Sequence, residues 1–221
     1  MWMLFIIHMA LIGMKAKDMR FEMFLDYPSP YAYLASTQLA KFGVEVDFRP
    51  IHVLEVMKRV NNQPSPLCPP KARYSGIDAR RWANLYGVPF EPHGQLLNAI
   101  KTGQFDRTLL TRAGIAAQEL GVSAQVNTQL FSALWATAPD LMTEDGRAAF
   151  LIANSLPSDL WRLAADQRII DRLAASIEEA AERGVFGVPT FFVDDEMFFG
   201  NDRLNFVEAR LKGTDVSGVA A

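Results

Sequence analysis

Apolar positions change their spacing twice near the start of the chain, and the changes predict a strand, a helix and a second strand. Segment 20–26 (RFEMFLD) is short and rich in Phe, Met and Leu, as is typical of a strand. Segment 30–42 (PYAYLASTQLAKF) has helical length and apolar spacing and stops at Gly43. Segment 44–50 (VEVDFRP) alternates and ends in proline. This order predicts a β-α-β unit with parallel strands and a right-handed crossover.

The middle of the chain, from residue 52 to about 163, carries helical patterns interrupted by a proline-rich loop over 64–70. Segment 74–87 (YSGIDARRWANLYG) places Trp82 and Tyr86 four residues apart and ends in glycine. Two further segments, FDRTLLTRAGIAAQELG and AQVNTQLFSALWATAP, show similar spacing. We therefore predict an all-helical block here.

The last part of the chain returns to strand patterns. Segment 166–184 predicts a long amphipathic helix, 190–200 (TFFVDDEMFFG) two strands around an Asp-Asp turn, and 201–213 a final helix. Strands at both ends and helices between them favour one split α/β layer that carries a helical subdomain. The small, polar residues of 214–221 predict a flexible tail.

The N-terminal 19 residues are harder to place. Residues 2–14 form a mostly apolar stretch of 13 residues, shorter than the ~20 that a membrane span needs. No positive charge precedes this stretch and no small-residue cleavage site follows it, unlike a secretory signal. We expect 1–19 to be an apolar extension outside the fold, with no stable membrane span, and weak membrane association is the alternative.

The net charge and the few cysteine and histidine residues limit which kinds of binding partner are expected. The 22 basic and 25 acidic side chains give a net charge of -3 without long runs of one sign, so no nucleic acid or anionic membrane is expected. The single cysteine, Cys68, excludes an internal disulfide and fits a reducing compartment such as the cytoplasm. His8, His52 and His93 lie far apart, so no metal site is predicted. A small-molecule partner is expected.

A serine stands where the first strand passes into its helix. Ser29 is followed by Pro30, which suits the first helical turn. The simplest interpretation is an N-cap worth ~1 kcal/mol. The same position also brings the hydroxyl next to unpaired backbone donors and the positive end of the helix dipole.

Two later features invite similar alternatives. Val188-Pro189 precedes a strand, where a cis bond is allowed, although most X-Pro bonds are trans. Asn201 and Asp202 follow a strand and a glycine at a helix start. They suit a simple capping pair, or a site in which helix N–H groups bind a carboxylate and Asp202 accepts from an ammonium.

Four stretches, taken together, resemble one family. They are DYPSPYAYLA, MKRVNNQP, RWANLYGVPF and GVFGVPTFFVDDEMFFGNDRL. In these stretches the chain resembles the 2-hydroxychromene-2-carboxylate isomerases, and behind them the kappa-class glutathione transferases and the DsbA-type disulfide oxidoreductases. The resemblance implies a thioredoxin-like domain over 20–51 and 166–213, interrupted by a helical insertion domain over 52–165.

The resemblance also implies a role for the serine corner. In the disulfide oxidoreductases the matching corner reads Cys-Pro-x-Cys, whereas here it reads Ser29-Pro30-Tyr31-Ala32. Thiol–disulfide exchange by a protein cysteine pair is therefore excluded at this corner. The implied cofactor is glutathione, whose sulfur would accept a hydrogen bond from Ser29. A hydroxyl donor and a helix N-terminus lower a thiol pKa and so favour the nucleophilic thiolate.

The remaining site residues follow from the same resemblance. Val188, before Pro189, would pair with the cysteinyl backbone of glutathione, and Asn201 and Asp202 would take its γ-glutamyl end. The implied substrate-binding residues are Lys58, Asn62, Trp82 and Tyr86. Read from the sequence alone, Lys58 and Asn62 fit a surface lysine and a turn asparagine equally well. For Trp82 and Tyr86 a core stripe is the more common explanation.

The implied function is a glutathione-dependent cis–trans isomerase acting on 2-hydroxychromene-2-carboxylate or a similar aromatic pyruvate. A kappa-like glutathione transferase or peroxidase is one alternative, and a non-catalytic glutathione-binding protein is another. The resemblance further implies a homodimer.

Overall fold

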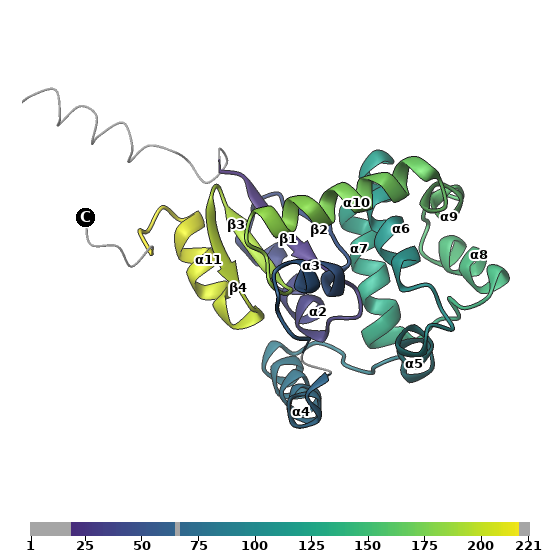
Figure 1. The fold of residues 1–221 in the computed structure, drawn as a ribbon, viewed down its shortest axis with the longest axis horizontal. Coiled ribbons are helices and arrows are strands. Elements are labelled where there is room, and N and C mark those ends of the chain that lie inside the picture. The colour runs from purple at the N-terminus through teal and green to yellow at the C-terminus, as the bar shows by residue number, and fades with distance from the viewer. Residues whose placement is uncertain (1–18, 65–66, 217–221) are drawn as a thin grey trace, which may run out of the picture.

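The structure is a computed structural model that describes residues 19–64 and 67–216 (Figure 1). Apart from Met19, the expected N-terminal extension lies outside the described residues, as do residues 217–221 of the expected tail. Within the described tail, the Thr214 amide donates to the Ala209 carbonyl and Val216 packs partly buried against the core. In the part of the chain that is described, no helix combines the length and apolar character needed to cross a membrane.

Four short strands form one mixed sheet. They are β1 (Phe21–Leu25), β2 (Asp47–Pro50), β3 (Thr190–Val193) and β4 (Glu196–Phe199), in the order β2-β1-β3-β4. β1 and β2 are parallel, whereas β3 runs antiparallel to both of its neighbours. The first and last parts of the chain thus share one sheet, as the split α/β prediction expected.

Helices connect and cover the strands. Between β1 and β2 lie α2 (Pro30–Ser36) and the 3-10 turn η2 (Leu39–Phe42). The helical region holds α3 (Val53–Arg59), α4 (Pro69–Tyr86), α5 (Gly94–Thr102), α6 (Arg107–Glu119), α7 (Ser123–Ser132), the π-helical turn η4 (Ala133–Thr137), α8 (Glu144–Ala153) and α9 (Leu160–Ala164). The chain returns to the sheet through α10 (Gln167–Glu182) and ends with η5 (Asn201–Arg203) and α11 (Leu204–Leu211). The inserted helical region is confirmed, while its limits of 52 and 165 stay predictions.

Several elements differ from their predicted extent: β2 begins only at Asp47, and the final helix begins as η5. The helix predicted over 30–42 ends at Ser36, because the hydroxyls of Ser36 and Thr37 donate to backbone carbonyls three residues back, at 2.7 and 2.6 Å. The chain continues as η2 and stops at Gly43 with a φ of 68°. In the helical region, α4 begins at Pro69, inside the predicted proline-rich loop, since proline is well tolerated in a first helical turn.

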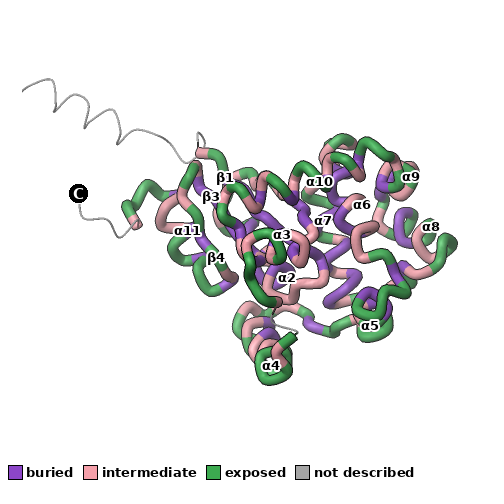
Figure 2. The backbone as a smooth tube through the Cα atoms, in the orientation of Figure 1, coloured by how far each residue is buried: buried purple, intermediate pink, exposed green. Residues whose placement is uncertain are grey.

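The central strand β1 is buried on both faces (Figure 2). Side chains alternate along a strand, so Glu22 and Phe24 share a face. On that face Arg183, the C-cap of α10, donates to Glu22 and lies over the Phe24 ring. On the other face Phe21 contacts Phe42 of η2. The strand is therefore held between helical layers.

The end of β1 is joined to the helical region. Arg107 at the start of α6 donates to the buried Asp26 carboxylate at 2.7 Å. The Trp135 indole N–H of η4 donates to the Tyr27 carbonyl at 2.9 Å. Both contacts lie within three residues of Ser29, so the helical region fixes the chain directly ahead of the serine corner.

Candidate active site

Ser29 is the N-cap of α2. Its backbone is extended, with φ -91° and ψ 115°, and its Oγ accepts from the Ala32 N–H at 3.2 Å. The hydroxyl lies 3.5 Å from the Val188 carbonyl oxygen, to which it donates. The Tyr31 N–H has no partner among the described residues. The two sequence features that lie 159 residues apart, the serine corner and the Val-Pro loop, therefore meet in space.

The loop that carries Val188 is held on both sides. The Val188-Pro189 bond is cis. A Cβ at Gly187 would lie 2.7 Å from the Phe199 ring, so a larger residue there would require that ring to move. The Asn62 amide donates to the Phe186 carbonyl at 2.7 Å. Asn62 thus lies beside the loop, at the end of the α3 turn, and acts as one of its supports.

Asn201 and Asp202 lie next to this loop. The Gly200 amide donates to the Pro189 carbonyl at 2.9 Å, which ties η5 to the cis bond. Asn201 is buried and its side-chain oxygen accepts from the Tyr86 hydroxyl at 3.1 Å. Asp202 is exposed and pairs with Arg203. The carboxylate of Asp202 is therefore accessible, whereas the Asn201 side chain is held by the Tyr86 hydroxyl of α4.

One face of α4 covers this group. The rings of Trp82 and Tyr86 lie 5.3 Å apart, and burial, followed by the charge of Asp202, raises the pKa of Tyr86 to about 12. Tyr86 is therefore a neutral donor at physiological pH. Further along the helix, Asp78 accepts from the Tyr31 hydroxyl at 2.9 Å. Burial and then the Asp78 hydrogen bond raise the pKa of Tyr31, which likewise stays neutral.

Lys58 is the one predicted site residue that the described contacts do not join to the others. It is exposed in the last turn of α3, and no described residue forms a hydrogen bond or ion pair with its ammonium. Its neighbour Met57 lies beside the loop, since the Met57 methyl would be 3.7 Å from a side chain at Gly187. Lys58 thus lies close to the loop that carries Val188, and its ammonium has no partner among the described residues.

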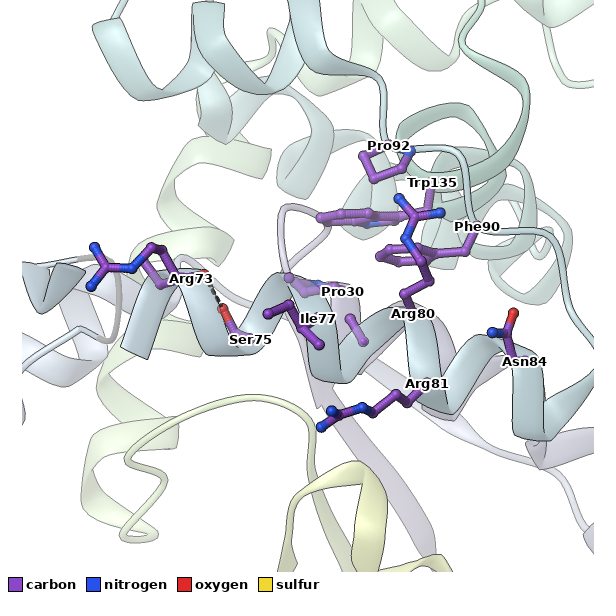
Figure 3. Close-up of a pocket in the computed structure, with 13 residues that line it drawn as sticks. Pro30, Arg73, Ser75, Ile77, Arg80, Arg81, Asn84, Phe90, Pro92 and Trp135 are labelled. Carbon is purple, nitrogen blue, oxygen red and sulfur yellow. Dashed lines mark hydrogen bonds between the residues drawn. The ribbon is translucent and has the colours of Figure 1, made fainter. Parts of the chain in front are cut away.

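Two open cavities adjoin the first turn of α2, and neither is lined by Lys58, Asn62, Trp82 or Tyr86. The smaller, of about 410 Å³, is lined by Tyr31, Pro70, Lys71, Tyr74 and Ser75. The larger, of about 710 Å³, lies between Pro30, α4, Phe90, Pro92 and Trp135 (Figure 3). Sequence analysis missed the larger cavity, because nothing in the sequence separates its Arg80 from an ordinary surface arginine. Within the described residues, no cluster of His, Cys, Asp or Glu could hold a metal ion.

Comparisons with known proteins agree with this architecture. The family model of the DSBA-like thioredoxin domain matches residues 20–212. A 2-hydroxychromene-2-carboxylate isomerase of Pseudomonas sp. (strain C18) is 31% identical over 212 residues, which are 89% of this chain and 92% of the relative. Glutathione S-transferase kappa 1 of Homo sapiens is 24% identical over 84% of this chain and 88% of the relative. A solved structure of a 2-hydroxychromene-2-carboxylate isomerase superposes with a TM-score of 0.74 at 25% identity, over 87% of this chain and 94% of that chain.

The chain therefore belongs to the family of DSBA-like thioredoxin domains. Within it, the resemblance to the 2-hydroxychromene-2-carboxylate isomerases is confirmed over most of the chain. The thioredoxin-like fold with an inserted helical region is confirmed as well.

Proposed function

We propose that this protein is a glutathione-dependent cis–trans isomerase of 2-hydroxychromene-2-carboxylate or a similar aromatic pyruvate. The observation that carries the proposal is the position of the Ser29 hydroxyl, at the start of α2 and against the Val188 carbonyl. The names of the relatives support the reaction class, because isomerases and a glutathione transferase match this chain over more than four-fifths of its length.

The groups around Ser29 fit glutathione. The Val188 N–H has no partner among the described residues, so it is free to pair with the cysteinyl backbone of the tripeptide. The exposed Asp202 carboxylate can accept from the γ-glutamyl ammonium, and Asn201 lies beside it. When bound, glutathione would supply the thiolate nucleophile for reversible addition to a conjugated carbon, and the residues of this corner would hold and orient it.

Ser29 would stabilise that thiolate by donating its hydroxyl hydrogen. An ordinary thiol has a pKa of ~8.5, and each unit by which a site lowers it is worth ~1.4 kcal/mol in favour of the anion. Ala32 already donates to the Ser29 oxygen, which leaves the hydroxyl hydrogen as the group to be directed at sulfur. Ser29 thus acts as a donor and not as a nucleophile.

The remaining predicted residues are proposed to bind the electrophile. The free ammonium of Lys58 suits a carboxylate, and would also disperse charge as the enolate develops. Asn62 uses its amide to support the loop, so its carbonyl oxygen is available to a substrate hydroxyl. Trp82 and Tyr86 would form an aromatic wall.

The test is a comparison of two substrates in the presence of glutathione. We expect conversion of 2-hydroxychromene-2-carboxylate, followed by its absorbance, that depends on added glutathione. Conversion of chlorodinitrobenzene alone would instead support the transferase alternative. Glutathione binding without turnover of either compound would support the non-catalytic alternative.

The resemblance also supports an oligomeric state, and the composition supports a cellular compartment. We propose a homodimer, which sedimentation velocity would show as twice the mass of the chain. The single Cys68 supports a reducing compartment, the cytoplasm, which cell fractionation would test.

A further inference from the structure

The larger cavity runs along α4 from Pro30, and Arg80 lies on the flank of α4 opposite Trp82 and Tyr86. At 3.6 residues per turn, Arg73, Arg80 and Asn84 follow one line along the helix. Trp82 and Tyr86 follow another line, and they face Asn201. The buried Ala79 and Ala83 separate the two lines. The cavity extends to Ser75 and Ala79, but a ligand bound at Arg80 would lie across the helix from Trp82 and Tyr86.

The far wall of the cavity is a fixed aromatic pair. The rings of Phe90 and Trp135 are stacked at 5.6 Å and 8°, and both are buried. The Trp135 indole is anchored by its hydrogen bond to the Tyr27 carbonyl. Trp135 itself lies in the π-helical turn η4, a rare conformation that occurs frequently at functional sites. The wall is thus formed before any ligand binds.

The near wall supplies positive charge. Figure 3 shows Arg80 reaching from α4 toward Phe90 and Trp135, and its guanidinium carbon lies 5.8 Å from the Phe90 ring centre. Stacking occupies the face of a guanidinium and leaves its N–H edges free for a carboxylate. Neither Arg73, Arg80 nor Arg81 has an ion-pair partner among the described residues, and the cavity lining contains no carboxylate. The site is therefore cationic and unneutralised.

We propose that this cavity is a second binding site, for a planar aromatic carboxylate. The carboxylate would accept from the free edge of Arg80, and the ring would lie against Ile77, Phe90 and Trp135. Its volume of about 710 Å³ falls inside the range of roughly 300–1,000 Å³ of small-molecule sites. Pro30 is the one lining residue that belongs to the serine corner, and none of the lining residues is among those proposed to bind glutathione or the electrophile, so the site does not depend on the proposed isomerase activity.

The test uses 1-naphthoate as a non-reactive probe in isothermal titration calorimetry with the full chain. We expect binding to the wild type, and a loss of tenfold or more in affinity for Arg80→Gln, since a hydrogen bond to a charged group is worth about 1.5–3 kcal/mol. Arg80 is exposed on α4, so the variant should keep its fold, which circular dichroism checks. Arg162→Gln on α9, also an exposed helical arginine, is the matched control and should bind as the wild type.

Further arms separate this site from the glutathione corner. Saturating glutathione should not displace 1-naphthoate, and Ser29→Ala should bind it unchanged. The neutral 1-naphthamide should bind at least several-fold more weakly. The proposal is overturned if the wild type does not bind the probe at millimolar concentrations, if Arg80→Gln binds it equally well, if the amide matches the acid, or if glutathione competes with it.

Discussion

Ser29 forms two hydrogen bonds: the bond from Ala32 fixes its oxygen, and the bond to Val188 can be replaced by a bond to a ligand. The bond from the Ala32 N–H holds the oxygen at the helix start. The bond to the Val188 carbonyl is long at 3.5 Å, so replacing that acceptor costs little. A sulfur anion would be a stronger acceptor, because hydrogen bonds to charged groups are about twice as strong as neutral ones. The residue is therefore prepared for an anionic partner.

Tyr86 carries the residue-scale prediction. Because its pKa is raised to about 12, it donates to buried Asn201 throughout the physiological range. Tyr86→Phe removes this donor, and a hydrogen bond of about 1 kcal/mol corresponds to a loss of about fivefold in glutathione affinity. Calorimetric titration with glutathione measures it.

Tyr74→Phe is the control for this change. Tyr74 is an exposed tyrosine on the same helix whose hydroxyl bonds Asp78. It should leave glutathione affinity unchanged, and equal affinity for Tyr86→Phe and the wild type would remove Tyr86 from the proposed site.

At the scale of secondary-structure elements, the buried carboxylate of Glu22 connects β1, β2 and the end of α10. Glu22 of β1 accepts from Arg183, the C-cap of α10, at 2.7 Å and from Arg49 of β2 at 3.2 Å. Burial, the largest single effect, would raise the pKa of Glu22, but the hydrogen bond from Arg183 and the charges of three arginines outweigh it and lower the pKa. The ion-pair network therefore fastens the long helix to the centre of the sheet.

The lowered pKa predicts how stability depends on pH. A carboxylate whose folded pKa lies below its unfolded value contributes stability above the unfolded value, here near 4.5, and loses it as the pH falls through the folded value. We expect the free energy of unfolding of Glu22→Gln, from urea titrations, to fall less steeply with decreasing pH below 4.5 than that of the wild type.

Glu208→Gln tests whether this slope belongs to the buried network. Glu208 forms only an exposed pair with Lys212 four residues on. Its variant should keep the slope of the wild type, because exposed pairs contribute little. A slope for Glu22→Gln as steep as that of the wild type would contradict the role given to the buried carboxylate.

At the scale of the whole molecule, the sheet and the helical region are joined through a buried charge. Asp26 accepts from Arg107 of α6 and from the Val53 N–H at the start of α3. Breaking such a pair leaves one charge buried without compensation, at a cost of about 3–5 kcal/mol. The two parts of the chain should therefore unfold together.

Arg107→Met tests this coupling by urea denaturation. We expect a loss of about 3–5 kcal/mol in the free energy of unfolding, still in one transition. Arg162→Met on the surface of α9 should change it by less than about 0.5 kcal/mol. A loss below about 1 kcal/mol for Arg107→Met would mean that Asp26 does not depend on Arg107.

The sequence predicts most of this fold because its signals are local. The strand at 21–25, the stop at Gly43 and the amphipathic α10 each follow from spacing within one segment. The early end of α2 does not, since it depends on which carbonyls the Ser36 and Thr37 hydroxyls bond. Local signals thus give the order of the elements better than their ends.

The candidate site depends on long-range contacts, so the sequence predicts it less completely. The resemblance to a family implies that Ser29 and Val188 both bind glutathione, but it does not predict their direct contact. The bonds of Asn62 to Phe186 and of Tyr86 to Asn201 join residues more than 100 positions apart, which spacing does not reveal. The Arg80 cavity needs side chains from four separate segments, and spacing within one segment does not reveal that they meet.

The central claim is that Ser29 holds a glutathione sulfur as its anion. The most direct measurement is the ultraviolet difference spectrum of glutathione bound at neutral pH to the wild type and to Ser29→Ala. The account predicts a thiolate band with the wild type that is lost or shifted to higher pH in the variant. A wild-type complex without thiolate, or an equal band in Ser29→Ala, would contradict it.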